Sequence, residues 1–220
     1  NIQSTKARIR VEATDINNLT GRDISDADFI ITGKDTTPPQ VTVISPNGGE
    51  VLANSDALKI TWRASDNVGV FSQDIQVSND GGSNYTTLQA GLAGNIQEFT
   101  LNIPSISERT KVKIIARDTQ NNVGSDDSDG VFAVLAKPSI SNAKYNNNAR
   151  RLMVFATTIS VNTEVTINGK VIPGSKKIKA NTGALILKGS LSDLNLRSGD
   201  NILMIKERGL ASGAFKLNLP

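Results

Sequence analysis

The stretch LKITWRA, residues 58–64, decides the fold class of this chain. Leu58, Ile60, Trp62 and Ala64 occupy alternate positions with polar residues between them, which is the pattern of a strand with one buried face. Because Trp62 shares the positions of the apolar residues, the pattern places it in a core and not on a sugar-binding surface. The stretch therefore predicts a half-buried β-strand.

Further short apolar stretches recur on both sides of this strand, separated by turn residues. The run Asn-Asp-Gly-Gly at 79–82 is typical of a hairpin turn, because these residues accept positive φ. No window shows a sustained 3.6-residue period, so the predicted fold class is all-β and the simplest architecture is a sandwich. The other strands expected here are 41–44, 71–77, 85–88, 99–103, 112–116 and 131–135.

The chain also repeats itself at an offset of 103 residues. Eight of the seventeen residues at 13–29 are identical to their counterparts at 116–132. A period near 100 residues matches one immunoglobulin-like sandwich, so the repeat predicts tandem immunoglobulin-like β-sandwiches, the first one incomplete. Residues 1–36 are then the C-terminal hairpin of the incomplete copy, with Ile9 and Val11 on one face and Phe29 and Ile31 returning beside them.

The second copy, residues 37–136, resembles a known group of proteins. The phrases that carry the resemblance are PQVTV at 39–43, SPNGGE at 45–50, ITW at 60–62, DNVGV at 66–70, SNDGG at 78–82 and KIIARD at 113–118. In this order they are similar to the bacterial immunoglobulin-like modules of large secreted and surface proteins. The resemblance implies an extracellular or cell-surface location, with other domains of the same or a larger protein as partners.

The remaining segment, residues 137–220, does not continue the repeat. Asn168-Gly169 between two apolar stretches predicts a two-residue hairpin. Further phrases of this segment are PSISNAKY at 138–145, RLMVFA at 151–156, VTING at 165–169, LNLRSGDN at 194–201 and GLAS at 209–212. In this order they are similar to IPT/TIG domains, another immunoglobulin-like sandwich, although the lysine-bearing stretch 173–180 departs from that pattern. The expected domains are therefore a partial module at 1–36, a complete sandwich at 37–136 and an IPT/TIG-like sandwich at 137–220.

The net charge of the chain changes sign at the same boundary, between residues 136 and 137. Residues 137–220 carry thirteen Lys and Arg against four acidic residues, a net charge of +9, whereas residues 1–136 carry −6. Lys176, Lys177 and Lys179 are therefore candidate ligands for a polyanion such as a polysaccharide. The alternative is a solvated basic surface, and no nucleic-acid partner is expected, because no RNA-binding signature with interleaved aromatic residues is present.

Aspartates suggest a metal site. Asp118, Asp126 and Asp129 lie within twelve residues and offer the hard oxygen ligands that calcium prefers. The alternative is that they only shape solvated turns between strands. Asp66 and Asn67 are further oxygen donors, whose position relative to this group the sequence leaves open. Calcium is the only cofactor considered, and none is required.

Composition argues against catalysis. The sequence contains no histidine and no cysteine, which excludes the familiar nucleophilic triads and thiolate chemistry, and no pair of acids is marked out as a glycosidase site. Its apolar runs are too short for a transmembrane segment. We therefore expect a non-catalytic structural or adhesive module array of a larger exported bacterial protein. The alternatives are a polyanion- or carbohydrate-binding module, and a filament subunit that self-associates through its N-terminal strands.

Overall fold

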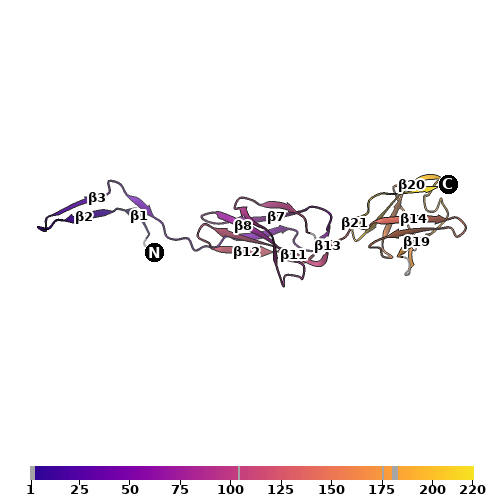
Figure 1. The fold of residues 1–220 in the computed structure, drawn as a ribbon, viewed down its shortest axis with the longest axis horizontal. Helices are drawn as coiled ribbons and strands as arrows, with labels where there is room; N and C mark the ends of the chain where they lie inside the picture. The colour runs from indigo at the N-terminus through magenta and orange to yellow at the C-terminus, as the bar shows by residue number, and fades with distance from the viewer. Residues whose placement is uncertain (1–2, 104, 175, 180–182) are drawn as a thin grey trace.

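The computed structural model describes residues 3–103, 105–174, 176–179 and 183–220. These residues form strands, turns and connecting segments, and none of them is helical. Figure 1 shows three parts that follow one another along the long axis of the molecule: a thin N-terminal segment, a middle module and a C-terminal module. The all-β fold class predicted from the sequence is confirmed.

The N-terminal segment contains two pairs of short antiparallel strands. β2 (Arg10–Thr14) pairs with β3 (Thr20–Ile24), and β1 (Ser4–Ala7) pairs with β4 (Phe29–Ile31). No second sheet among the described residues covers either pair. The segment is therefore an incomplete sandwich.

The middle module is a complete immunoglobulin-like sandwich. One sheet has the order β10-β7-β5, and the other has the order β6-β13-β11-β8-β9, with β12 also paired to β11. Trp62 is 1% exposed in the core between the two sheets, which confirms its predicted position. The strands are β5 (Gln40–Ser45), β6 (Val51–Ala53), β7 (Leu58–Ser65), β8 (Val70–Ser78), β9 (Thr86–Ala93), β10 (Glu98–Leu101), β11 (Ser107–Asp118), β12 (Val123–Asp127) and β13 (Phe132–Leu135).

A buried glutamine satisfies the polar atom of this tryptophan. The indole Nε1 of Trp62 donates a hydrogen bond of 2.6 Å to Oε1 of Gln73, which is itself fully buried. The Gln73 amide nitrogen in turn donates to the backbone carbonyls of Ala93, Gly94 and Ile96. Since buried polar groups are costly when unpaired, this one side chain links the two sheets through their core.

The strand pairing confirms the repeat in its register. Ser4 lies opposite Ile31 as Ser107 lies opposite Val134, and every pair of the β2–β3 ladder recurs 103 residues later in the β11–β12 ladder. One detail differs from the expectation: the strand beside β2 is β3, whereas β4 lies beside β1. In the middle module a single strand, β11, spans both positions, because β8 pairs with it across the intervening residues.

The C-terminal module is a second sandwich with its own core. Its sheets have the orders β14-β15-β19-β18 and β17-β16-β20-β21, with β22 paired to β20. The predicted hairpin is present, since Asn168 and Gly169 both have positive φ between β16 and β17. The strands are β14 (Ile140–Asn146), β15 (Arg151–Ala156), β16 (Glu164–Ile167), β17 (Lys170–Val171), β18 (Lys176–Lys179), β19 (Ala184–Lys188), β20 (Gly199–Glu207), β21 (Leu210–Ala211) and β22 (Phe215–Leu219).

Side chains bridge the two sandwiches. Arg208 forms an ion pair with Glu108, and Lys137 Nζ lies 2.6 Å from Asp56 Oδ1. Leu210 of β21 lines a cleft together with β6 of the middle module. Leu210 is half-buried, and the two ion pairs are exposed, so each pair by itself contributes little stability to this junction.

Candidate metal centre at the module junction

Three strand ends meet at the end of the middle module that faces the N-terminal segment. Gln40, the first residue of β5, lies opposite Ser65, the last residue of β7, and β11 ends at Asp118. Asp66 follows β7 directly, and Asp35 belongs to the linker that leads into β5. Asp35, Asp66 and Asp118 consequently converge, with one carboxylate oxygen of each within 4.8 Å of the others.

Backbone N–H groups hold two of these carboxylates in place. Asp118 Oδ1 accepts hydrogen bonds of 2.8 Å from the backbone N–H groups of Gln120 and Asn122. Asp66 Oδ2 accepts bonds of 2.8 Å and 3.0 Å from those of Val68 and Gly69. Each side chain is thus oriented by the tight turn that follows its strand.

The linker carboxylate is held in a similar way. Asp35 Oδ1 accepts a hydrogen bond of 3.0 Å from the Thr37 N–H and one of 3.1 Å from the Asn67 side chain. The Thr37 N–H and then the Asn67 amide lower the pKa of Asp35 below its usual value, so this group is ionised at neutral pH. Asn122 Nδ2 adds a bond of 3.1 Å to the Asp35 backbone carbonyl, which fastens the linker to the module.

Two of the three remaining carboxylate oxygens have no hydrogen-bond donor among the described residues. The Asp35 Oδ2 and Asp66 Oδ1 atoms are buried and accept no hydrogen bond from the described residues, although both side chains are only half-buried. The whole Asp118 residue is 0% exposed. Asp118 Oδ2 accepts one bond of 2.7 Å from Asn122 Nδ2. Buried carboxylate oxygens without a partner are unfavourable, so this cluster is the strongest candidate among the described residues for holding a cation.

Asp126 and Asp129, which sequence analysis grouped with Asp118, lie elsewhere. Asp126 Oδ2 accepts a 2.7 Å hydrogen bond from the Val43 N–H and so joins β12 to β5. Asp129 Oδ2 accepts one of 2.7 Å from Asn47, beyond the other end of β5. The structure brings Asp118 together with Asp35 and Asp66 instead. Sequence reasoning missed Asp35, for which the only signal was an aspartate directly before the Thr-Thr-Pro-Pro linker.

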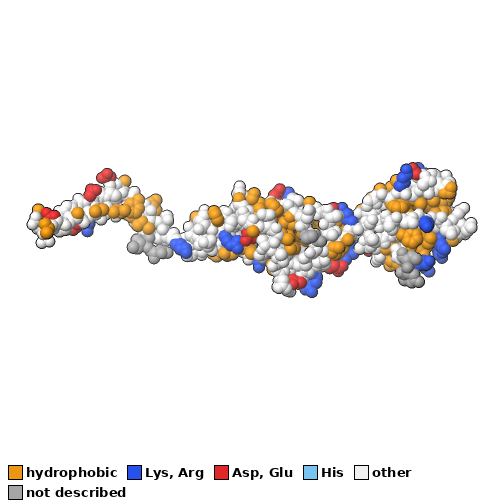
Figure 2. Space-filling view, viewed as in Figure 1, with side chains coloured by type: hydrophobic (Ala, Val, Ile, Leu, Met, Phe, Trp, Pro, Cys, Tyr) orange, Lys and Arg blue, Asp and Glu red, His pale blue; other side chains and the backbone are white. Residues whose placement is uncertain are grey.

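The three candidate polyanion ligands lie on strand β18, which among the described residues pairs with β19 alone and so forms an edge of its sheet. Lys177 and Lys179 are exposed, whereas Lys176 is half-buried. Figure 2 shows several groups of Lys and Arg side chains over the C-terminal module. Lysines on an edge strand also oppose unwanted strand pairing, which is a structural explanation for the same residues. Residues 175 and 180 of the predicted stretch lie outside the described residues.

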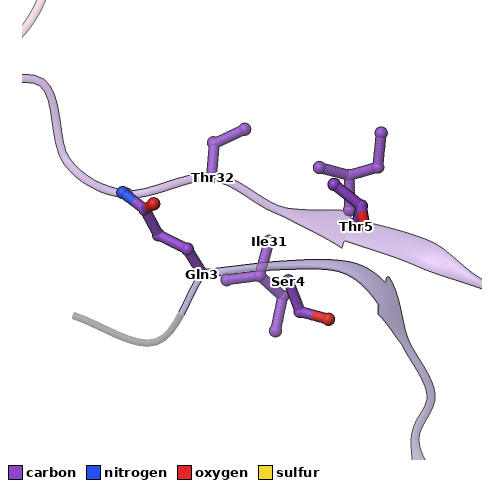
Figure 3. Close-up of a pocket in the computed structure, with 7 residues that line it drawn as sticks. Gln3, Ser4, Thr5, Ile31 and Thr32 are labelled. Carbon is purple, nitrogen blue, oxygen red and sulfur yellow. The ribbon is translucent and has the colours of Figure 1, made fainter.

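The N-terminal segment exposes an apolar face. Ile9 and Val11 are 60% and 63% exposed, whereas their counterparts in the repeat, Val112 and Ile114, are fully buried. Apolar side chains form a row along this segment in Figure 2. Figure 3 shows the open hollow at the β1–β4 pair, where Ser4 lies beside Ile31. The hollow is lined by Gln3, Ser4, Thr5, Ile30, Ile31, Thr32 and Gly33.

Comparison with known proteins gave matches among solved structures alone. No protein-family model and no curated protein matches the sequence. The fibronectin(III)-like modules of Clostridium thermocellum CbhA match with 15% identity and a TM-score of 0.37, over 80% of this chain and 91% of that one. A tetra-tandem repeat from the extending region of a large adhesion protein matches with 20% identity and a TM-score of 0.31, over 97% of this chain and 56% of that one.

The chicken CNTN1 FN1–FN3 domains match with 15% identity and a TM-score of 0.32, over 82% of this chain and 64% of that one. The chain thus spans less than two thirds of the second and third of these structures. TM-scores below 0.4 do not define a common fold, so the fold of this chain is defined by the sheets and cores described above. Within the described residues, no helix has the length and apolar character needed to cross a bilayer.

Proposed function

We propose that the chain is a non-catalytic structural or adhesive module array of a larger exported bacterial protein, located outside the cell or on its surface, where it spaces or presents another domain. The proposed domains are the partial module at 1–36, the sandwich at 37–136 and an IPT/TIG-like sandwich at 137–220. The observation that carries the proposal is the end-to-end arrangement of these parts, with side-chain contacts at both junctions (Figure 1).

The contacts at the second junction favour a spacer over two loosely tethered domains. Leu210 of the C-terminal module contributes to two clefts, one against β6 and one that also contains Ile106 and Leu135. The half-buried Leu210 side chain therefore lies between the two sandwiches, and the apolar surface that it withdraws from water favours one relative orientation of the modules. A spacer needs this property, because it has to keep the domains at its two ends apart.

The experiment measures how much the distance between the middle and C-terminal modules varies. The chain has no cysteine, so paired spin labels at Asn95→Cys and Gly213→Cys, both exposed positions, report one distance between the two sandwiches. We expect a narrow distance distribution that Leu210→Ser broadens, whereas Val171→Ser, at a 50% exposed position on β17, leaves it unchanged. A broad distribution in the unsubstituted chain would contradict the spacer function.

A second candidate function is binding of a polyanion or polysaccharide through the C-terminal module. It is supported by the net charge of +9 on residues 137–220 and by the exposed lysines of β18. The Lys177→Gln variant is expected to elute from a heparin column at lower salt than the Lys59→Gln variant, whose substitution lies in the acidic part of the chain, residues 1–136. Equal elution of both variants and the unsubstituted chain would exclude β18 as the binding surface.

A third candidate is a filament or swapped oligomer, in which strands of another copy complete the N-terminal segment. It is supported by the exposed face of β2, since the equivalent face of the middle module is buried. Deleting residues 1–36 should convert an oligomer to a monomer, as measured by light scattering. A chain that is monomeric both before and after the deletion would exclude complementation.

A further inference from the structure

We propose that the outer face of the C-terminal sheet β14-β15-β19-β18 docks on an anionic lipid bilayer. Within their described bounds these four strands contain no acidic residue and six basic ones: Lys144, Arg151, Lys176, Lys177, Lys179 and Lys188. The strands of the other sheet contain three acidic and three basic residues. One sheet thus carries a charge of +6 and the other is neutral, an asymmetry that turns the charged sheet toward a negative surface.

The strand register places two of these cations on either side of an apolar pair. Met153 of β15 lies opposite Lys144 of β14 on one side and opposite Ile186 of β19 on the other. Ile186 in turn lies opposite Lys177 of β18. Alternate residues of β15, such as Leu152, are buried in the core, so this row faces away from the core. With strands roughly 4.8 Å apart, the two lysines start about 14 Å from each other.

A second row on the same face places two cations directly opposite each other. Arg151 of β15 pairs with Lys188 of β19, and both residues are exposed. Like charges at directly opposed positions destabilise a sheet. None of the ion pairs formed by the described residues includes Arg151, Lys188, Lys144 or Lys177. These four cations and the apolar pair between them form the cationic face, and an anionic partner would supply the counter-charge that it lacks.

The nearest acidic residue along the chain does not neutralise the cationic face. Asp193 lies in the loop after β19, where its carboxylate accepts hydrogen bonds from the backbone N–H and the hydroxyl of Ser190. Its ion pair, at 3.7 Å, is with Arg150 in the turn before β15. Asp193 and Arg150 therefore balance each other, and the charge of the cationic face remains.

The apolar centre of the cationic face favours a bilayer over a hydrophilic polyanion. At a bilayer, basic residues contact headgroup phosphates while apolar side chains contact the boundary of the acyl chains. Met153 and Ile186 are only half-buried, and Phe155, the next outward residue of β15, is half-buried too. Figure 2 shows hydrophobic side chains next to Lys and Arg side chains on this module, in the region that Figure 1 labels β14 and β19. Cations spread over a sheet face also suit a planar partner.

The experiment is co-sedimentation of the full chain with vesicles of phosphatidylglycerol and phosphatidylcholine in equal amounts. We expect binding that weakens with added salt and is absent with phosphatidylcholine alone. Each basic residue near an anionic surface strengthens binding roughly fivefold, so Arg151→Gln and Lys188→Gln should each weaken it by about that factor. Lys170→Gln is the matched control, because it removes the same charge from an exposed position of the other sheet and should change binding far less.

Two further measurements separate bilayer docking from its alternatives. Met153→Gln should weaken binding to the vesicles and leave retention on a heparin column unchanged, because a hydrophilic polyanion makes no apolar contact. Arg151→Gln and Lys188→Gln should not lower the melting temperature, because each removes one of two opposed like charges, so their loss of binding is not a loss of fold.

Three results would overturn the proposal. They are failure to sediment with the anionic vesicles at low salt, equal weakening by Lys170→Gln and Arg151→Gln, and retention on heparin without binding to vesicles. The last of these would support the polysaccharide-binding function instead. The proposal does not depend on the spacer function, because lipid binding and the distance between the modules are measured separately.

Discussion

Replacing Gly124 with alanine should destabilise the middle module. Gly124 lies in β12, beside the chain that enters β5, and its φ is outside the left-handed region, so alanine is compatible with its backbone. A Cβ atom added there would lie 1.7 Å from the backbone carbonyl oxygen of Pro39. The glycine is therefore required by close approach of two backbones, not by conformational freedom.

The size of the effect follows from this contact. Real Cβ atoms essentially never lie within 3.0 Å of another heavy atom, so the 1.7 Å separation has to open by moving the start of β5 away from β12. Such overpacking costs roughly 1–3 kcal/mol. The same movement stretches the hydrogen bond between the Val43 N–H and Asp126, and a bond to a charged group contributes about 1.5–3 kcal/mol. We expect the free energy of unfolding to fall by about 3 kcal/mol.

The assay is urea unfolding followed by the fluorescence of Trp62. It is the only tryptophan of the chain and is 1% exposed in the core of the middle module, so its signal reports this module alone. Gly21→Ala is the matched control, because Gly21 is the repeat counterpart of Gly124 and an added Cβ meets nothing within 4 Å. An unchanged unfolding midpoint for Gly124→Ala, or equal shifts in both variants, would refute the reasoning.

Two further predictions concern the same module. Gln73→Leu leaves the indole N–H of Trp62 without its acceptor, so the free energy of unfolding measured in urea should fall by about 3 kcal/mol, whereas an unchanged value would mean that this bond contributes nothing. Burial raises the pKa of Asp74, but the Gly91 N–H and the Arg117 guanidinium lower it by more, so the pKa of Asp74 in the folded protein lies below its ordinary value. This carboxylate therefore stabilises the fold above about pH 4 and loses that contribution as the pH falls toward its folded pKa, and Asp74→Asn should flatten the decline of melting temperature in acid.

Much of the fold could be predicted from local pattern. The alternation around Trp62 predicted its strand and its buried face, because successive side chains of a strand point to opposite sides. The repeat predicted that the N-terminal segment has the turns of the middle module, and the identical turn residues Asn18 and Asn121 do adopt the same positive φ, 64° and 65°. The expected neighbours of Ile9 and Val11 were wrong, because β2 pairs with β3 and not with β4. The repeat also did not predict that β1 and β2 are separate strands, because the continuity of β11 depends on β8, a neighbour distant in sequence.

The candidate site was only partly visible in the sequence. Asp118 attracted attention because it lies among other aspartates, but proximity along the chain grouped it with Asp126 and Asp129, whose carboxylates bond to other parts of the module. A chain position does not show which way a strand end faces or which linker passes beside it. That information exists only when β5, β7 and β11 are paired in their sheets.

By itself, then, the sequence determined that this protein is a series of β-sandwiches, because strand period, turn chemistry and repeat length are local properties of the chain. Only the tertiary structure decided which of its acidic side chains lie close together. Asp35, Asp66 and Asp118 belong to a linker and to two different sheets, and they converge because packing those sheets face to face brings their ends to one side of the module. The unfilled oxygens of that cluster are a property of the folded arrangement alone.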